Sequence, residues 1–455
     1  MQSIHFIAIG GSIMHNLALA LQQSGYQITG SDDEIHEPSY SRLSSAGLLP
    51  KSLGWYPDKI TKDIDAVIVG MHARKDNPEL LKAQELGLAI YSFPEFIYQK
   101  SLQKQRVVIA GSHGKTTITS MILHVLKYWN KSFDYAVGAQ IASFDLMVKL
   151  SDAPLIIIEG DEYLSSPTDP RPKFLHYHHH IALISGIAWD HFNVFPQYEQ
   201  YIKAFEQLID ITDKGGIVYY YAGDKSLAKL FKKDTNEDFT FTPYEALDAK
   251  VKDGKTYLKT KNGEVAISVF GDHNLQNLSG AMSVLLRLGI TTDMFYEAIA
   301  SFKGASKRLE KLFELNETVF FKDFAHAPSK LKATVEAVKT QYPKRKLVAV
   351  QELHTYSSLN KEFIQQYKDT AKAADEFLIY INPKAVALKK LEMLSLQELQ
   401  SAFNRKDIQL FTDKSDLENY LCQKTWKGQN LLLMGSGSYD HMDLTKIQSQ
   451  IQKTA

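Results

Sequence analysis

The chain has 455 residues, enough for about three domains that each bury a core of their own. Its 52 Lys and Arg residues balance 52 Asp and Glu residues, which excludes the broad basic surface of a nucleic-acid-binding protein. One cysteine, Cys422, excludes an intrachain disulfide framework, and no apolar run reaches the roughly 18 residues of a membrane span. With no leader-like start, we expect a cytoplasmic multi-domain protein without nucleic-acid or membrane partners, and nothing indicates an oligomeric state.

Short apolar strands alternate with helical spacers in the N-terminal part, and a glycine turn follows the first strand. This order predicts a right-handed βαβ unit of the nucleotide-binding kind, which continues to a polar, basic linker. The expected elements are strands at Ile4–Ile9, Tyr26–Thr29, Ala66–Val69 and Ala89–Tyr91, a turn at Gly10 and Gly11, a helix at Ile13–Gln23 and the linker at Gln99–Arg106.

A second strand–turn–helix unit follows at once. Val107–Ala110 reads as a strand, Gly111–Gly114 as a turn and Thr116–Trp129 as a helix. Two buried strands, Leu155–Ile158 and Ile181–Ser185, belong to the same predicted domain.

Strands restart once more after a helical and a basic segment, which predicts a third α/β domain. We therefore expect an α/β protein of three domains, covering residues 1–103, 104–312 and 313–455, without internal repeats or heptads. The segments are the helix Asn274–Leu288, the basic stretch Lys303–Lys311, and strands at Val319–Lys322, Leu347–Gln351, Phe377–Tyr380 and Leu431–Met434.

The second glycine turn has the composition of a phosphate-binding loop, because backbone N–H groups and a helix N-terminus surround a phosphate at such a place. Lys115 would neutralise the outer phosphates of a nucleotide, and the Thr116 hydroxyl would bind magnesium. The loop is a shortened version, since Ile109 stands where the full pattern has its first glycine, so a purely structural turn is the alternative. Its residues are Gly111, Ser112, His113, Gly114, Lys115, Thr116 and Thr117.

Possible metal ligands follow two of the buried strands. Glu159 comes directly after Leu155–Ile158, and Asp190 and His191 follow Ile181–Ser185. Ligands bind at the carboxyl ends of parallel strands, and magnesium prefers oxygen donors, so Glu159 suits it best and His191 is a less usual ligand. Taken alone, a glutamate or histidine at a strand end is more often a surface residue.

The first glycine turn is weaker evidence. Gly10 and Gly11 permit the close approach of a diphosphate, and Asp32 could accept hydrogen bonds from a ligand. A Gly-Gly turn equally fits a Rossmann domain for a nicotinamide cofactor, so a nicotinamide-dependent oxidoreductase remains an alternative of another class.

Six segments in order along the chain together resemble the Mur ligase family, whose members join a carboxylate to an amine with ATP and magnesium. One of these motifs alone would be weak, but all six occur at compatible spacing over nearly the whole chain. The segments are Gly111–Thr117, Glu159–Glu162, Asp190–His191, Gly271–Asn277, Lys307–Glu310 and Asp323–Pro328.

The resemblance implies a Rossmann-like UDP-binding domain, a central P-loop ATPase domain and a C-terminal Rossmann-like domain. It implies that Thr116 and Glu159 hold one magnesium ion, that Glu159 and His191 hold a second, and that Lys115, His191 and Arg308 are catalytic. On the same basis, Asn274 and Asn277 would face adenine, Arg308 the terminal phosphate and Asp323 the ribose, with His326 in the same loop; Gly10, Gly11, Ser12, Met14, Ser31 and Asp32 would bind the UDP-sugar.

The amine substrate is the finer question. Phe205 stands where several branches of the family carry a carbamylated lysine, which resembles the branch that uses free UDP-N-acetylmuramate. Ala73–Pro78, Asp169–Tyr177 and Asp323–Pro328 are similar to ligases that attach a recycled tripeptide, L-alanyl-γ-D-glutamyl-meso-diaminopimelate, through an acyl phosphate. His354–Ser358 instead resembles enzymes that add L-alanine. We expect the tripeptide reaction of peptidoglycan recycling, with L-alanine ligation as the alternative.

Three classes of function can be told apart by assay. A ligase releases ADP and phosphate only when both the carboxylate and the amine are present, whereas an oxidoreductase changes the absorbance of a reduced nicotinamide. A silent nucleotide-binding regulator binds ATP without turnover, and the set of Lys115, Thr116, Glu159 and His191 argues against it. Folylpolyglutamate-type ligases share the ATP site, but the UDP-type first domain argues against them.

Overall fold

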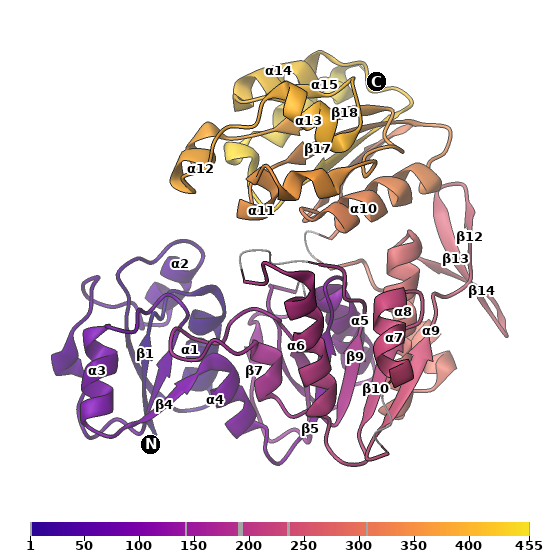
Figure 1. Cartoon of the computed structure of the whole chain (residues 1–455). Coiled ribbons are helices and arrows are strands. Elements are labelled where there is room, and N and C mark those ends of the chain that lie inside the picture. Colours follow the sequence, from indigo (N-terminus) through magenta and orange to yellow (C-terminus); the bar gives the residue numbers. More distant parts are fainter. Residues whose placement is uncertain (1, 142, 190–193, 234–236, 306–307, 455) are drawn as a thin grey trace. The chain divides into compact units, whose positions relative to one another are not determined.

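The computed structural model describes the chain except for residues 1, 142, 190–193, 234–236, 306–307 and 455. The chain divides into two compact units, each described here by itself (Figure 1). The first comprises Met1–Trp189, Pro196–Glu245 and Gly280–Ala298, and the second comprises Asp190–Phe195, Ala246–Ser279 and Ile299–Ala455. Helices and largely parallel sheets make up both units, which confirms the predicted α/β class.

The first unit begins with a parallel sheet of strand order β2-β1-β3-β4. Val67, Val69 and Leu80 belong to one buried core of this sheet, as expected for parallel strands covered by helices. The elements are β1 Ser3–Ile7, α1 Ser12–Gln23, β2 Gln27–Ser31, α2 Ser39–Ser45, the 3₁₀ helix η1 Pro57–Lys59, β3 Ala66–Val69, α3 Pro78–Glu85, β4 Ala89–Ser92 and α4 Phe93–Lys100.

A seven-stranded sheet follows in the order β11-β10-β9-β5-β8-β6-β7, parallel except for β7. The central strands β5, β8 and β9 contain the buried apolar runs Val107–Ala110, Ile156–Ile158 and Ile181–Ile184, and their carboxyl ends lie at one edge of the sheet. The elements are β5 Gln105–Ala110, α5 Lys115–Tyr128, β6 Asp134–Ala136, β7 Val148–Lys149, β8 Leu155–Glu159, η2 Lys173–His176, β9 Ile181–Ile184, α6 Tyr198–Asp210, β10 Ile217–Tyr221, α7 Lys225–Lys233, β11 Thr240–Tyr244 and α9 Thr292–Ile299. Helix α8 Asp272–Arg287 is divided between the units, with residues up to Ser279 in the second and the rest in the first.

The second unit is built on a six-stranded sheet of order β15-β16-β20-β17-β18-β19, in which only β15 is antiparallel. Along β17, Leu347 and Ala349 enter one buried core, whereas Val348 and Val350 enter the other, because successive side chains of a strand point to opposite faces. The elements are β15 Glu310–Leu315, β16 Thr318–Asp323, α10 Pro328–Gln341, β17 Lys346–Glu352, α11 Tyr356–Leu359, η3 Phe363–Tyr367, β18 Glu376–Tyr380, α12 Pro383–Leu388, α13 Leu396–Phe403, β19 Gln409–Phe411, α14 Lys414–Gln423, β20 Gln429–Met434, η4 Tyr439–His441 and α15 Leu444–Thr454.

A small antiparallel sheet in the second unit was not predicted. Its strands are β12 Ala249–Lys252, β13 Lys255–Thr260 and β14 Gly263–Ile267, joined as a meander. Asp253 and Gly254 between the first two strands both have positive φ, at 50° and 70°, as a two-residue hairpin turn requires. The Asp-Gly and Asn-Gly pairs of this segment are the sequence signals that could have revealed it.

The connection between the first two sheets lies within the predicted linker at Gln99–Arg106 but is shorter, comprising residues 101–104. Gln99 and Lys100 are the last residues of α4, and β5 already begins at Gln105. Arg106 is 5% exposed, and its guanidinium bonds to the carbonyls of Tyr177 and His178. A basic residue in a polar stretch suggested solvent, but these carbonyls satisfy the buried charge.

Two helices of the first sheet begin with side-chain caps. Asn77 accepts hydrogen bonds from Glu79 N and Leu80 N at the start of α3. At the start of α4, the Glu95 carboxylate accepts from both the backbone N and the hydroxyl of Ser92, each at 2.7 Å. This capping box fixes the position of the Glu95 side chain.

The turn after β1 contains a non-glycine residue in the left-handed region. Ala8 has φ of 67° and is fully buried. A Cβ added to the neighbouring Gly70 would lie 3.0 Å from the Ala8 Cβ. This backbone conformation favours glycine, since an L-residue is strained there.

Three adjacent histidines precede β9. His178 and His180 are partly exposed, but His179 is fully buried and its Nε2 lies 2.9 Å from Thr212 Oγ1. Burial, reinforced by the charges of His178, His180 and Arg106, lowers the pKa of His179 to about 3. The middle histidine of this loop therefore belongs to the buried interior.

Acid should destabilise the protein through His179. Its folded pKa of about 3 lies below the unfolded value of 6.5, so its stabilisation is complete above about pH 6.5 and is lost as the pH falls towards 3. This group should lower the free energy of unfolding by about 1.4 kcal/mol per pH unit in that window. Thermal unfolding followed from about pH 7.5 to about pH 5 should show a shallower loss for His179→Gln than for wild type. Equal slopes would refute the assignment, and exposed His36→Gln is the control.

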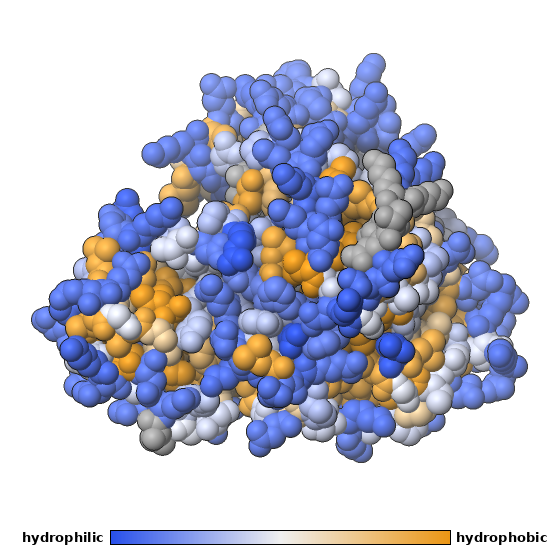
Figure 2. All heavy atoms as spheres, turned by 60° about the horizontal axis from the view of Figure 1, so that its bottom comes forward, coloured by the Kyte–Doolittle hydropathy of each residue, from blue (hydrophilic) through white to orange (hydrophobic). Residues whose placement is uncertain are grey.

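Hydrophilic side chains are spread over the face drawn in Figure 2, with apolar groups between them. Among the residues that the structure describes, no helix combines the length and apolarity needed to cross a bilayer.

Candidate functional site

The phosphate loop joins β5 to α5 as predicted. Gly111 has φ of 120°, and a Cβ there would lie 2.3 Å from Ser185 Oγ, so only glycine fits this close approach. Gly114 occupies the N-cap of α5 in the left-handed conformation and offers no side chain to the first turn. Residues 111–117 therefore form a compact turn at a helix N-terminus whose N–H groups suit a phosphate.

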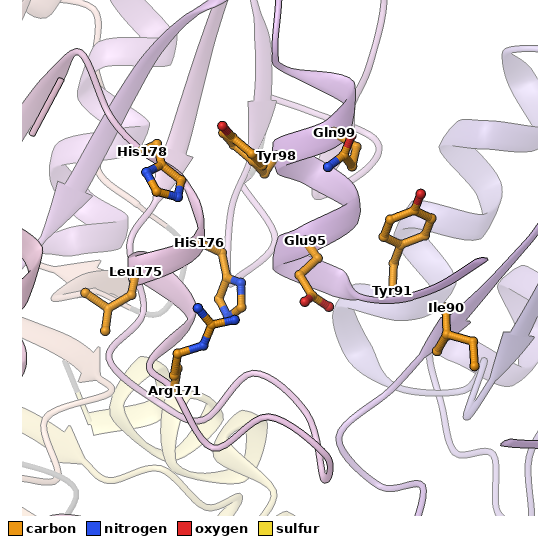
Figure 3. A pocket seen from close by; sticks show the side chains of 9 residues that line it. All are labelled: Ile90, Tyr91, Glu95, Tyr98, Gln99, Arg171, Leu175, His176 and His178. Carbon is orange, nitrogen blue, oxygen red and sulfur yellow. The ribbon is translucent and has the colours of Figure 1, made fainter. Parts of the chain in front are cut away.

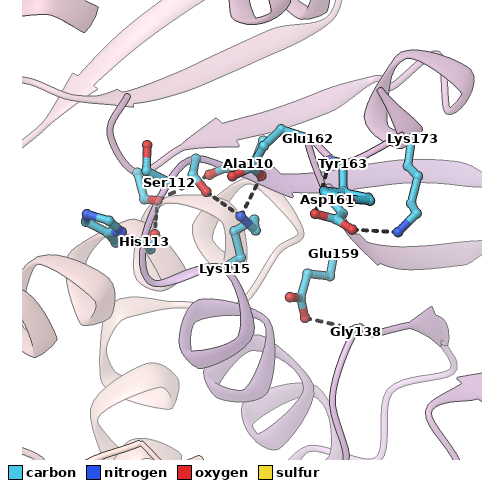
Figure 4. A network of polar contacts seen from close by, with 12 residues as sticks. Ala110, Ser112, His113, Lys115, Gly138, Glu159, Asp161, Glu162, Tyr163 and Lys173 are labelled. Atoms are coloured by element: carbon cyan, nitrogen blue, oxygen red, sulfur yellow. Dashed lines mark hydrogen bonds and ion pairs between the residues drawn. The ribbon is translucent and has the colours of Figure 1, made fainter. Parts of the chain in front are cut away.

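Lys115 is held by two acceptors (Figure 4). Its Nζ lies 2.6 Å from Glu162 Oε2 and 2.8 Å from Gly111 O. Burial lowers the pKa of this ammonium, but the charges of Glu162, Asp161 and Glu159 outweigh burial, and the net pKa is raised. Lys115 is thus a permanent positive charge beside the loop.

Glu162 connects Lys115 to the rest of the loop. Its side chain is fully buried, and Tyr201 Oη of α6 lies 3.0 Å from its Oε1. The same phenol lies 2.9 Å from Ser112 Oγ. A hydrogen-bonded chain therefore runs from Ser112 through Tyr201 and Glu162 to Lys115, and it compensates the buried carboxylate.

Thr116 and Glu159 meet as the sequence predicted. The Thr116 hydroxyl donates to Glu159 Oε1 at 2.9 Å. Gly138 N donates to Glu159 Oε2 at 3.1 Å (Figure 4). A hydroxyl and a carboxylate at this separation are the hard oxygen donors that magnesium prefers, so the residues present fit this ion. Phe205, in contrast, is buried against Phe174 and offers no ligand atom.

A second ion pair lies on the same segment. Lys173 Nζ lies 2.7 Å from Asp161 Oδ2. Burial raises the pKa of Asp161, but Lys173 and Lys115 outweigh this and the net pKa is lowered. Backbone bonds from Lys173 N to Tyr163 O and from Phe174 N to Asp161 O fold the segment after Glu159 back on itself.

The remaining loop residues lie where the sequence placed them. The Ser185 hydroxyl bonds to the carbonyl of His113, which joins the loop to the end of β9. Thr117 is buried in the first turn of α5. His191 and Asp190 lie outside the described residues, so the geometry presented here comprises Lys115, Thr116 and Glu159.

The first glycine turn brings Gly10 and Asp32 together. Gly10 N donates to Asp32 Oδ2 at 2.7 Å, and Glu34 N donates to Asp32 Oδ1 at 3.4 Å. Asp32 is only 3% exposed, and burial raises its pKa despite these bonds. Asp32 thus shapes the turn itself, a structural role that the sequence did not reveal.

The other predicted UDP-site residues surround this turn. Ser31 Oγ accepts from Lys59 Nζ at 3.1 Å. Ser12 begins α1, with its hydroxyl 3.8 Å from Met147 Sδ, and Met14 is buried. A Cβ on Gly11 would lie 3.3 Å from Met14 Cγ, so these positions are tightly packed.

Predicted adenine-facing residues lie in the second unit, at the start of α8. Asn274 Nδ2 donates to Phe270 O at 2.9 Å, and Asn277 Nδ2 lies 3.4 Å from Asn274 Oδ1. Both asparagines are buried. The spacing of three residues puts them on one face of the helix.

The predicted phosphate and ribose residues of the second unit cluster around Phe324. The Arg308 guanidinium lies 4.8 Å from the centre of the Phe324 ring, and the His326 ring lies edge-on to it at 5.1 Å. Asp323 Oδ2 accepts from Thr334 Oγ1 at 2.5 Å. The structure therefore brings Arg308 and His326 together within this unit.

Sequence reasoning missed the roles of Glu162 and Tyr201. Glu162 stood in a recognised motif without an assigned role, and no pattern in the sequence singled out Tyr201. A buried acidic residue beside a loop lysine needs a cation and a donor, but the sequence does not identify partners 47 and 39 positions away.

Replacing Glu162 by glutamine should lower the pKa of Lys115, because the largest charge that stabilises the ammonium is lost. The alkaline limb of kcat/KM for ATP should therefore move to lower pH. Steady-state rates of ADP release from about pH 8 to about pH 11 test this. Exposed Glu206→Gln, on α6, is the matched control. An unchanged alkaline limb in Glu162→Gln would contradict the pairing.

Two family models match the chain. "Mur ligase family, catalytic domain" matches residues 3–105, and "Mur ligase middle domain" matches residues 109–285. Together they cover both sheets of the first unit.

Similar full-length proteins carry related names. UDP-N-acetylmuramate–L-alanine ligase of Carboxydothermus hydrogenoformans is 29% identical over 458 residues, covering 97% of this chain and 95% of that protein. The crystal structure of UDP-N-acetylmuramate–alanine ligase from Thermotoga maritima has a TM-score of 0.70 at 21% identity, covering 100% of this chain and 99% of that one. That of a murein peptide ligase from Psychrobacter arcticus has a TM-score of 0.67 at 21% identity, covering all of both chains. At this identity the structures show the shared three-domain fold.

Proposed function

Because this chain belongs to the Mur ligase family, whose members are ATP-dependent, ADP-forming amide ligases of peptidoglycan synthesis, we propose that it acylates an L-alanyl amine with UDP-N-acetylmuramate. The observation that carries the proposal is the convergence of Lys115, Thr116 and Glu159 at the end of one sheet. We also propose that the chain has three domains, at residues 1–103, 104–312 and 313–455.

Two candidate substrates present an L-alanyl amino group. Free L-alanine is the first candidate, because relatives with that activity in their names align over 97% of the chain. The tripeptide L-alanyl-γ-D-glutamyl-meso-diaminopimelate is the second, supported by the segments Ala73–Pro78, Asp169–Tyr177 and Asp323–Pro328. The named relatives support L-alanine better than the tripeptide that the sequence had favoured.

The carboxylate must be activated before the amine can attack it, because oxide is too poor a leaving group. The lactoyl carboxylate attacks the terminal phosphorus of ATP, the bond to the bridging oxygen breaks and ADP leaves, which gives an acyl phosphate. The amine then attacks the acyl carbon and expels phosphate, and its proton passes to solvent. Lys115 offsets the negative charge gathered during the first step.

Magnesium would be held by Thr116 and Glu159, with His191 as a further proposed ligand. When bound, it neutralises phosphate charge and polarises the transferred group. Glu159 itself is oriented by Thr116 and Gly138 N, so its carboxylate needs little rearrangement.

The other predicted residues complete the proposal. Arg308 would bind the terminal phosphate, and Asp323 the ribose, with His326 beside them. Backbone N–H groups of the loop would contact the phosphates. The adenine would lie against Asn274 and Asn277; Gly10, Gly11, Ser12, Met14, Ser31 and Asp32 would bind the UDP-sugar.

The test compares both amines directly. Purified protein with ATP, magnesium and UDP-N-acetylmuramate is given L-alanine or the tripeptide, and products are identified by mass spectrometry alongside ADP release. An adduct with either amine supports the ligase, and the larger kcat/KM selects the substrate. ADP release without an adduct, or no turnover with either amine, would refute the proposal. No observation favours the oxidoreductase.

A further inference from the structure

A pocket lies away from the phosphate loop, between β4 and α4 on one side and the segment around η2 on the other (Figure 3). Its volume is about 280 Å³. At its edge, one ligand atom each of Glu95, Asp169 and His176 lies within 4.8 Å of the others. The lining residues are Ile90, Tyr91, Glu95, Tyr98, Gln99, Arg171, Leu175, His176 and His178.

The imidazole of His176 points to a missing ligand. Its side chain is 4% exposed, and its Nε2 has no hydrogen-bond partner among the described residues. A buried polar nitrogen left in this way is costly unless something binds it. A neutral imidazole nitrogen in such a place can coordinate a metal ion.

The distance from His176 Nε2 to Asp169 Oδ2 is 3.4 Å. This is long for a hydrogen bond. Two ligands of a tetrahedral zinc ion, each about 2.0–2.1 Å from the metal, are about 3.3–3.4 Å apart. The pair therefore already has the separation of two metal ligands.

We propose that Glu95, Asp169 and His176 bind one divalent transition-metal ion of the zinc class. One imidazole and two carboxylates form a ligand set that suits zinc, and a water from the pocket would supply a fourth ligand. The set differs in kind from Thr116 and Glu159, whose hard oxygen donors suit magnesium.

The ligands are oriented by neighbours. Ser92 holds the Glu95 carboxylate through the capping box. Arg171 binds both oxygens of Asp169, at 2.6–3.1 Å, but a carboxylate offers about four lone-pair sites, so Asp169 can keep Arg171 while it binds a metal. The Arg171 side chain is 59% exposed and can also move aside.

Charge favours a cation at this place. Glu95 and Asp169 carry two negative charges against the single positive charge of Arg171, and His176 is neutral. An additional anion would be repelled by this net negative charge, whereas a divalent cation would neutralise it. The ion would connect α4, which carries Glu95, to the stretch of chain that follows Glu159. That stretch carries Asp161 and Glu162 as well as Asp169 and His176.

Binding is measured on the full-length protein after treatment with a chelator. Zinc is titrated by calorimetry in the presence of excess magnesium, and cobalt(II) is added separately to record its visible absorption. We expect one zinc ion per chain with micromolar or tighter affinity, and the intense d–d bands of tetrahedral cobalt. No binding near one ion per chain would overturn the proposal.

Variants locate the site. Glu95→Gln preserves the capping box, since glutamine also caps, and His176→Gln removes the imidazole. Each should weaken zinc binding at least about 100-fold and abolish the cobalt bands. His178→Gln, in the same pocket, and Glu159→Gln, at the magnesium site, should bind zinc as wild type does. If His176→Gln fails to fold, the zinc affinity of Glu95→Gln decides the question. The assignment is overturned if Glu95→Gln binds zinc with wild-type affinity, or if Glu159→Gln loses zinc binding.

Discussion

Replacing Lys115 by methionine is expected to reduce ATP-dependent amide formation by at least about 100- to 1,000-fold. The ammonium is the cation that the structure holds beside the phosphate loop, and its raised pKa keeps it charged at any physiological pH. Loss of that charge removes stabilisation that is needed most when the terminal phosphoryl group transfers. Rates of ADP release and of amide product, measured against ATP concentration, give the loss in kcat and in kcat/KM.

The variant also leaves Glu162 as an uncompensated buried carboxylate, which by itself can destabilise the fold by about 3–5 kcal/mol. The double variant Lys115→Met, Glu162→Gln removes both charges and separates the two effects. It should regain thermal stability but not activity. Exposed Lys131→Ala, just beyond the same helix, should behave as wild type. Near-normal turnover in a folded double variant would rule out the assigned role.

A glutamine at position 159 should lower activity by about 100-fold or more and raise the magnesium concentration needed for half-maximal rate. The amide oxygen can still accept from Gly138 N, and the Thr116 hydroxyl can rotate to accept from the amide NH2, so the packing persists while the negative charge on the proposed metal ligand is lost. Product formation is followed across a magnesium titration at fixed ATP.

Asp152→Asn, an exposed carboxylate shortly before β8, serves as the control for a generic loss of negative charge. Its magnesium dependence should match wild type. If Glu159→Gln kept the wild-type magnesium dependence, Glu159 would not be a metal ligand, and the convergence with Thr116 would be structural only.

Much of the architecture follows from local sequence. The central strands were predicted because a fully buried parallel strand is a continuous apolar run, as Leu155–Ile158 is. The loop at Gly111–Gly114 was found because its glycines stand between a strand and a helix, where positive φ is needed. Such signals lie within a few residues of one another and need no tertiary information.

The missed features depend on contacts between distant segments. Burial of Arg106 and His179 cannot be read from their polar neighbours, because the partners come from other elements. The pairing of Glu162 with Lys115, and of Asp169 with His176, likewise exists only once the segment after β8 folds back. Motif spacing identified the candidate site residues, whereas their hydrogen-bond and ion-pair partners depend on tertiary packing.

The turn at Ala8 also constrains how this sequence can vary. Its left-handed backbone favours glycine and disfavours β-branched and bulky residues, and its methyl group lies in the space that a side chain at Gly70 would need. A change to glycine at position 8 would relieve the closest of the contacts that exclude alanine at position 70. In related sequences, therefore, the residues at these two positions should covary, with alanine tolerated at one of them at a time.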